Sequence, residues 1–214
     1  MMATLPAPAV ALLDFIASKE APRGYGTIYG NNQHRLARPI TAMTLDELIA
    51  AQAGFTARYG SSASGRYQFM RATLRGLKAE LGLAGSTPFS PDLQDRLGYH
   101  LLRRRGYDDF VAARISRTEF GRRLAQEWAS LPVLQATAGA NRRVARGQSY
   151  YAGDGRNKAL VAAAEVEQVL DAVLAARGAP AGGNADLPEP APRDASWIVR
   201  LARAILDALK GADR

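Results

Sequence analysis

Residues that begin and end helices recur along the first 177 residues, and they constrain the fold of this chain more than any other feature. A helix often begins at a serine or threonine whose side chain binds a free amide of the first turn. The pattern is matched by Thr44 followed by Glu47, by Ser90 followed by Pro91, and by either Ser116 or Thr118. After each of these capping residues, apolar residues recur every three or four positions, which is the spacing of one helix face. The sequence therefore predicts a mostly helical domain.

We expect six helices and one small β or irregular region in this domain. Residues 21–43 are rich in glycine, asparagine, proline and threonine and are typical of short strands and turns. The predicted helices are the stretch before Pro22, 44–54 closed by Gly54, 66–83, 90–106 closed by Gly106, 116–131 before Pro132, and roughly 157–176. The predicted fold class is α+β and predominantly helical.

The composition divides the chain into three segments. Residues 1–177 form the predicted domain, and residues 178–193 read as a linker because proline, glycine and alanine dominate there. Residues 194–214 predict an amphipathic helix, whose apolar side contains Trp197, Ile198, Leu201, Ile205 and Leu209. This helix has three interpretations: it docks on the domain, it binds itself or a partner helix, or it lies on a membrane surface. Its near-balanced charge weakens the attraction to anionic lipid, which favours the first two interpretations together over the membrane surface.

Glu20 lies at the end of the first predicted helix, where a carboxylate is unfavourable for two reasons. It continues the apolar face of Leu13 and Ile16, and it places a negative charge at the negative end of the helix dipole. Both effects raise the pKa of a carboxyl group, and a carboxyl group that stays protonated near neutral pH can donate a proton. The alternative is that Glu20 faces solvent or pairs with Lys19 or Arg23.

Composition excludes several classes of chemistry. The chain has no cysteine, so disulfides, thiolate catalysis and thiolate metal sites are ruled out. Its two histidines, His34 and His100, are far apart and have no acid-rich spacing around them. We therefore expect no metal and no other cofactor. The N-terminus lacks the basic start of a secretory signal, and no stretch is apolar enough to span a membrane, so we expect synthesis in the cytoplasm.

The net charge of +8 favours an anionic partner. Residues 178–214 hold five basic and five acidic side chains, so the whole excess belongs to residues 1–177. Nucleic acid, anionic lipid and bacterial wall polymer all remain open on charge alone. The runs "RRRG" at 103–106 and "NRRVARG" at 141–147 raise nucleic-acid binding, but a solvated basic face that attracts the anionic wall explains them more simply. We expect no nucleic-acid partner.

Three short motifs resemble segments of the lambda-type phage endolysins and related phage muramidases. They are "SSASGRYQFM" at 61–70, "FSPDLQDRLG" at 89–98 and "EWASLP" at 127–132, in that order and at similar spacing, and the resemblance covers about residues 9–175. It implies a lysozyme-like fold and a peptidoglycan lytic transglycosylase, which breaks the β-1,4 bond between N-acetylmuramic acid and N-acetylglucosamine and leaves a 1,6-anhydro sugar. The family's catalytic acid closes the first helix, which is Glu20 here.

The sequence itself bears on the mechanism. A glycosidase that uses water generally needs a second carboxylate, yet no Asp or Glu lies between Ala21 and Thr44, where a lysozyme-like fold would supply it. A mechanism with Glu20 as the single acid and base fits better. The alternative is a hydrolytic lysozyme in which Asp92, Asp95 or Asp154 folds into the cleft.

The resemblance also points to substrate-binding residues in the "GRYQ" motif. Tyr67 and Gln68 can hold hydroxyl and acetamido groups, and Ser64 and Gly65 let the backbone approach the sugar closely. Tyr67 has an equally good alternative as a core aromatic, because it opens an apolar face.

Other residues in the matched region are weaker candidates. Tyr150 and Tyr151 precede a glycine-rich turn, an arrangement suited to stacking on sugars at the rim of a cleft, although an ordinary loop explains them as well. Gln94 and Asp95 match the family and can be structural, and Trp128 is expected in the core.

The predicted function is therefore that of an endolysin that degrades peptidoglycan and lyses bacteria. Its partners would be the glycan strands of the wall, with a membrane or protein contact through the C-terminal helix. It would reach the wall of the periplasm only after another agent releases it from the host cytoplasm. A third class of function is a wall-binding virion protein without activity.

Overall fold

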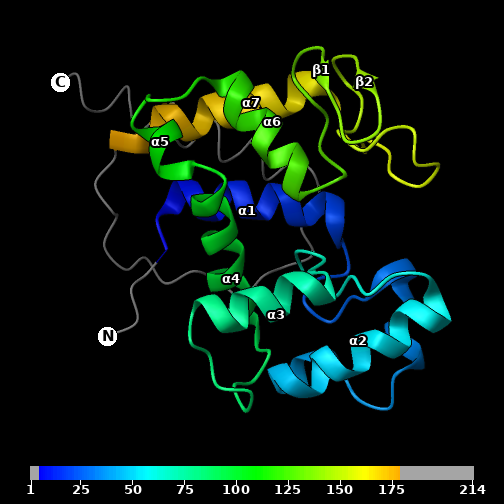
Figure 1. Cartoon of the computed structure of the whole chain (residues 1–214). Helices are drawn as coiled ribbons and strands as arrows, with labels where there is room; N and C mark the ends of the chain where they lie inside the picture. The colour runs from blue at the N-terminus through cyan, green and yellow to red at the C-terminus, as the bar shows by residue number, and fades with distance from the viewer. Residues whose placement is uncertain (1–4, 179–214) are drawn as a thin grey trace.

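The computed structural model describes residues 5–178, which form a mostly helical domain with one small two-stranded sheet (Figure 1). This is the helical α+β class that the sequence predicts. The predicted C-terminal helix and nearly all of the linker lie outside the described residues. In chain order the elements are α1 (Ala7–Glu20), η1 (Tyr29–Arg35), η2 (Ile40–Ala42), α2 (Leu45–Tyr59), α3 (Arg71–Glu80), α4 (Pro91–Arg104), α5 (Tyr107–Val111), α6 (Arg117–Glu127), β1 (Thr137–Ala138), β2 (Arg143–Val144), α7 (Ala163–Ala175) and η3 (Ala176–Gly178).

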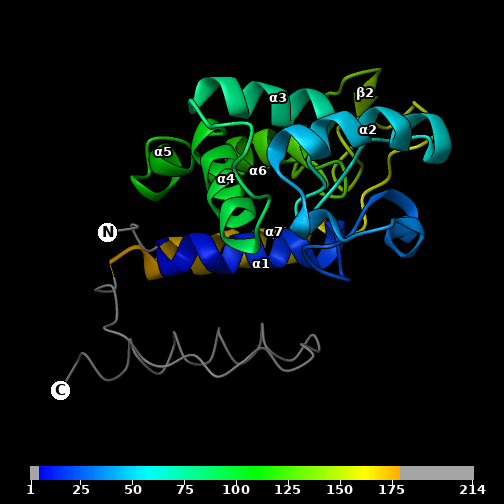
Figure 2. The same ribbon diagram turned by 90° about the horizontal axis from the view of Figure 1, so that it is seen from below.

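Helix α4 runs through the middle of the domain (Figures 1 and 2). Helices α1 and α7 lie side by side at one of its ends, and α2 and α3 pack against each other at the other. The buried side chains of these helices form one continuous apolar core, which includes Leu12 and Ile16 of α1, Leu97 and Leu101 of α4, and Leu170 of α7. The C-terminal end of α1 lies on the loop-rich side of the molecule (Figure 1).

The predicted helix starts are confirmed. Thr44 and Glu47 form a reciprocal capping box: the Glu47 backbone N–H donates to Thr44 Oγ1 at 3.3 Å, and the Thr44 backbone N–H donates to Glu47 Oε2 at 2.8 Å. The hydroxyl groups of Ser90 and Ser116 cap α4 and α6 by accepting from the third residue of each helix. Local side-chain chemistry therefore sets these boundaries.

The predicted end of α2 at Gly54 is wrong. The helix continues to Tyr59 because Phe55, which is buried, prolongs its apolar face. It stops at Gly60, whose φ of 84° lies in the left-handed region that glycine adopts without a steric penalty. Gly54 is a glycine inside a helix, which costs some stability without ending it.

Three other helices are shorter than predicted, and α6 is one of them because it ends at Glu127 and not near residue 131. Helix α3 begins at Arg71, because Tyr67 belongs to a tight turn in which Ser64 and Phe69 pair across a β-bridge. The apolar spacing that includes Tyr67 and Met70 is therefore not a helix face, and Met70 is exposed. Helix α7 begins at Ala163 and not near residue 157. The short helix α5 was not predicted.

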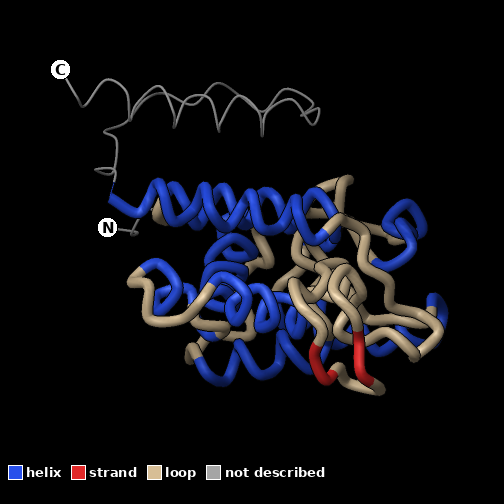
Figure 3. Tube along the Cα trace, turned by 90° about the horizontal axis from the view of Figure 1, so that it is seen from above, coloured by secondary structure: helices blue, strands red, loops and turns tan. Residues whose placement is uncertain are grey.

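The β structure lies in a different place from the one expected. Residues 21–43 form the 3₁₀ helices η1 and η2, and Ile28 makes only an isolated bridge with Ser64. The strands of the described region, β1 and β2, pair antiparallel at 137–144, outside the predicted β region (Figure 3). Each strand has two residues, too few for the period-2 pattern that identifies strands in a sequence.

No helix within residues 5–178 has both the length and the apolar character needed to cross a membrane.

Candidate active site

Glu20 is the last residue of α1, and its carboxylate is bound by Ser130. The Ser130 hydroxyl donates to Glu20 Oε1 at 2.6 Å, and the Ser130 backbone N–H lies 3.4 Å from the same oxygen. Burial raises the pKa of Glu20, while the two hydrogen bonds from Ser130 favour the ionised form and oppose that rise. The net shift is upward, so Glu20 keeps its proton to a higher pH than an ordinary glutamate.

The predicted alternative, in which Glu20 pairs with a neighbouring cation, does not occur. Lys19 binds Glu165 of α7 at 2.8 Å, and Arg23 is exposed. Glu20 makes no ion pair with any group of residues 5–178. Its helix face is buried as expected, with Leu13 and Ile16 both inside the core. Without a nearby cation, burial dominates the titration of this carboxyl group.

Ser130 belongs to the loop that follows α6. The side chains of Trp128 and Leu131 anchor this loop in the core, and the Ser130 carbonyl accepts a hydrogen bond from the Leu160 backbone N–H at 2.8 Å. Sequence reasoning did not assign a role to Ser130, although it lies in the "EWASLP" motif. The available signal was a hydroxyl group placed between residues that a core would bury.

The Ser130 contact makes a testable prediction about Glu20. Replacing Ser130 by alanine removes the hydroxyl donor that favours the ionised form, so we expect the pKa of Glu20 to rise further. An NMR titration of the Glu20 carboxyl carbon measures this shift. Ser149→Ala is the matched control, because the Ser149 hydroxyl donates to the Ala129 carbonyl in the same region and does not bind Glu20. An unchanged titration in the Ser130 variant would contradict the assigned contact.

Gly65 and Gln68 lie in the tight turn between the bridged residues Ser64 and Phe69. The Gln68 backbone N–H donates to the Gly65 carbonyl at 3.1 Å, and the Phe69 N–H donates to the Ser64 carbonyl at 2.8 Å. Gly65 has a φ of 82°, and a Cβ there would lie 2.5 Å from Gln94 Oε1. Only glycine fits this position, since any side chain would collide with an amide that holds the turn.

Gln68 has a backbone conformation that is unusual for its residue type. Its φ is 49°, in the left-handed region, and its side-chain amide donates to the Gly65 carbonyl at 2.9 Å. Such strain persists only where the surrounding structure imposes it, and it concentrates at functional sites. The conformation therefore supports Gln68 as a candidate contact for substrate.

Arg66 of the same turn joins it to two helices. The guanidinium binds Asp14 of α1, contacts Asp95 of α4 at 3.4 Å, and donates to the Tyr25 hydroxyl at 2.8 Å. Tyr25 and Tyr67 in turn donate to the two oxygens of Asp95, at 2.8 and 2.7 Å. We call these five residues the Arg66 network. It fixes the turn relative to α1 and α4.

The structure places Ser64 and Tyr67 inside the domain. The Ser64 hydroxyl donates to the Ser62 carbonyl at 2.9 Å, and the Tyr67 hydroxyl is bound to Asp95. For Tyr67 this favours the core alternative. Both residues hold the turn, and Gln68 is the partly buried side chain that the turn presents.

Tyr150 and Tyr151 lie next to the Ser130 loop. Their rings meet edge to face with centroids 5.3 Å apart, and the Tyr151 hydroxyl donates to the Gln126 carbonyl at 2.6 Å. The preceding residue, Ser149, forms a bridge with Pro132. The tyrosine pair is thus joined to the loop that binds Glu20, whereas Gln68 is joined to α1 through residues 21–28 and through the Arg66 network.

The three other acids proposed for the cleft all have partners elsewhere. Asp92 is exposed and pairs with Arg96 at 3.2 Å, and Asp95 belongs to the Arg66 network. Asp154 accepts hydrogen bonds from the backbone N–H groups of Arg156 and Asn157, which lower its pKa. None of the three contacts Glu20.

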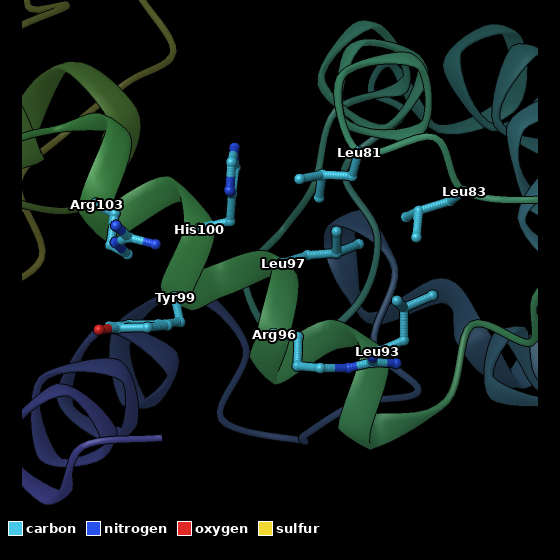
Figure 4. Close-up of a pocket in the computed structure, with 8 residues that line it drawn as sticks. All are labelled: Leu81, Leu83, Leu93, Arg96, Leu97, Tyr99, His100 and Arg103. Carbon is cyan, nitrogen blue, oxygen red and sulfur yellow. The ribbon is translucent and has the colours of Figure 1, made fainter. Parts of the chain in front are cut away.

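Residues 5–178 hold no cluster of three or more side chains that could together bind a metal ion. A hollow of about 290 Å³ lies between the end of α3 and α4, with Leu93 and Leu97 on its apolar side (Figure 4). The basic side chains at its edge are already paired, His100 with Glu80 and Arg96 with Asp92. This hollow offers no free acid.

The model of a protein family described as Endolysin matches residues 11–156, which include Glu20, the tight turn, Ser130 and both tyrosines. No curated protein and no solved structure matches the chain.

Proposed function

The chain belongs to the endolysin family of phage enzymes that degrade the bacterial cell wall, and from this premise we propose that it is a lytic transglycosylase. It would cleave the β-1,4 bond between N-acetylmuramic acid and N-acetylglucosamine, with Glu20 as the single acid and base. The observation that carries the proposal is the Glu20 carboxyl group itself: its pKa is raised by burial, and it is oriented by Ser130 without a neighbouring cation.

In this mechanism one proton leaves Glu20 and another returns. Protonated Glu20 donates to the glycosidic oxygen, and the bond from that oxygen to the anomeric carbon of the muramic acid breaks. The 6-hydroxyl oxygen of the same sugar bonds to the anomeric carbon, and the Glu20 carboxylate takes the hydroxyl proton. Glu20 ends as it began, and no water is consumed. Ser130 stabilises the carboxylate between the two transfers.

Asp95 and Asp154 are already bound to other groups, which supports a mechanism with one carboxylate. A hydrolase needs a second carboxylate to attack the sugar or to activate water. Asp95 is bound by two tyrosines and Arg66, and Asp154 caps its own loop, so neither is free for that work.

Substrate contacts would come from two loops, the tight turn at 64–69 and the loop that contains Tyr150 and Tyr151. We propose that the Gln68 amide and the backbone at Gly65 bind sugar substituents on one side, and that Tyr150 and Tyr151 support the glycan on the other. Ser64 and Tyr67 would position the turn without touching the sugar.

The fate of solvent oxygen tests the mechanism directly. Cleavage of purified peptidoglycan in ¹⁸O-labelled water is expected to release 1,6-anhydro sugars that contain no label, because the closing oxygen comes from the substrate. Mass spectrometry of the released muropeptides measures this. A labelled reducing end on the muramic acid would mean a hydrolase, and release of no sugar ends at all would favour a wall-binding protein without activity.

The pH profile gives a second test. Because one group must be protonated at the start, kcat/KM on a soluble glycan is expected to stay level at low pH and to fall once the pH exceeds the raised pKa of Glu20. We expect no fall in kcat/KM at low pH until the pH at which the protein unfolds. A bell-shaped profile would indicate a second group that must be ionised.

The cellular context is also a proposal. The enzyme would be made in the host cytoplasm and reach the wall of the periplasm after another agent opens the membrane. The C-terminal residues 194–214 would contact a membrane surface or a protein. Deleting residues 179–214 and measuring wall lysis and liposome leakage separately tests that contact, because loss of leakage alone indicates the membrane.

A further inference from the structure

Positive charge is concentrated beside the Ser130 loop. Residues 128–164 contain five basic side chains and one acid. The acid, Asp154, is occupied by the backbone of its own loop, and one of the cations, Arg146, pairs with Glu167 at 2.7 Å. The four that remain are Arg142, Arg143, Arg156 and Lys158, which we call the basic lobe.

All four side chains of the basic lobe are exposed, and none pairs with a carboxylate in the part of the chain that the structure describes. Elsewhere arginines are commonly matched: Arg105 binds Glu127, Arg122 binds Glu119, and Arg117 binds Asp171. Uncompensated charge next to a candidate active site attracts anions from solution and focuses them there.

Backbone hydrogen bonds connect the basic lobe to the site. The Leu160 N–H donates to the Ser130 carbonyl at 2.8 Å. Lys158 lies two residues before Leu160, so the Cα atoms of these two residues are at most about 7.6 Å apart. At the other end, the Ala140 N–H donates to the Tyr150 carbonyl at 2.9 Å, and the Asn141 side chain donates to the Tyr151 carbonyl. The β1–β2 hairpin and the loop after it lie together on one side of the molecule (Figure 1).

We propose that the basic lobe binds the free carboxylates of the stem peptides, so that the preferred substrate is peptide-bearing glycan. This inference rests on the proposed function. Each stem peptide is attached to the muramic acid, the sugar whose anomeric bond Glu20 would break, so its carboxylates enter the site together with that bond. A binding surface for them must lie close to the Ser130 loop, and the segments that carry these cations are hydrogen-bonded to that loop and to the tyrosine pair beside it. Cations that bind a lipid surface could lie anywhere on the protein and would not need to be beside the Ser130 loop.

The charges should act on binding more than on the chemical step. Contacts between exposed ions are individually weak and are screened by salt. Three of them together give a preference of about tenfold in KM at low salt. The value of kcat should hardly change, because the carboxylates lie outside the reacting bond.

The experiment uses the full-length chain and two substrates from one wall preparation, intact glycan and glycan stripped of its peptides by an amidase. The test variant is R143Q/R156Q/K158Q; Arg142 is kept because its side chain packs beside Gly153. The matched control is R58Q/R75Q/R177Q, which removes the same charge from exposed residues without ion pairs in the described chain. Thermal unfolding checks that all three proteins are folded.

We expect the wild type and the control to prefer the intact glycan by about tenfold in KM, and the test variant to lose that preference. Equal KM values for both substrates in the wild type, or the same loss in the control, would overturn the inference and leave the proposed function standing. If the wild type cleaves neither substrate, the proposed function fails first. If the test variant keeps its preference but no longer binds phosphatidylglycerol vesicles, the lobe serves a lipid surface instead.

A binding measurement keeps the inference testable without turnover. Calorimetry on the Glu20→Gln protein should detect a lower affinity for muramyl tripeptide after the three lobe substitutions and unchanged affinity after the three control substitutions. The same affinity in both would contradict the lobe as the peptide site.

Discussion

Replacing Glu20 by glutamine is expected to reduce glycan cleavage by roughly 10²–10⁴-fold, the contribution of a positioned general acid. Glutamine has nearly the same shape and can still accept the hydrogen bond from the Ser130 hydroxyl. It cannot donate an acidic proton to the glycosidic oxygen. Release of soluble muropeptides from purified peptidoglycan measures the loss.

The matched control for this variant is Glu165→Gln. Glu165 is an acid of α7 beside the last turn of α1, where it binds Lys19, and it is not part of the proposed mechanism. Its removal costs one partly exposed ion pair away from the Glu20 carboxyl group, so activity should be retained. Equal losses in the two variants, or activity that survives in the Glu20 variant, would remove Glu20 from its proposed role.

The same substitution should raise stability at neutral pH. Because the pKa of Glu20 is higher in the folded protein than in the unfolded chain, the folded state binds more protons, and its stability falls as the pH rises through these pKa values. Glutamine has no proton to lose and avoids this cost. The Glu20→Gln protein should therefore melt at a higher temperature than the wild type at pH 7. This advantage should disappear as the pH falls to about 4 and below, where Glu20 is mostly protonated in both the folded and the unfolded state. An advantage independent of pH would point to packing instead.

The burial and the raised pKa of Glu20 could be predicted from the sequence because its unusual position is local. The apolar face, the proline after the helix and the end of the dipole can all be counted along a few residues. The caps at Thr44, Ser90 and Ser116 are confirmed for the same reason, since each depends on a hydrogen bond three residues away. Features that depend on residues a few positions apart can therefore be predicted from the sequence.

Features set by distant contacts were missed or misplaced. Ser130 reaches Glu20 across 110 residues, and no local pattern marks that pairing. Tyr67 has the spacing of a helix face, but its bond to Asp95 and the turn around Gly65 remove it from α3. Gly60 ends α2 where Gly54 does not, because the buried Phe55 makes it favourable to continue the helix. Tertiary packing decides each of these cases.

Replacing Arg66 by alanine is expected to lower the free energy of unfolding by about 3 kcal/mol, the lower end of the range for breaking a buried ion pair by removing one partner. The Arg66 and Asp14 side chains are only 16% and 14% exposed, so water replaces the lost cation poorly. Asp95 loses the same cation, and the rings of Tyr25 and Tyr67 lose a guanidinium within 6 Å of their centres. Urea unfolding measures the change.

Two further variants separate charge from geometry in the Arg66 network. Arg75→Ala removes an exposed arginine that has no ion pair in the described residues, and it should change stability by less than about 0.5 kcal/mol. Arg66→Lys keeps the positive charge but has only one nitrogen, whereas the arginine contacts Asp14 and Tyr25 through different nitrogens at once. We therefore expect a loss between those of the other two variants. A lysine variant as stable as the wild type would mean that charge alone holds the turn, and the fixed position of Gln68 would then need another cause.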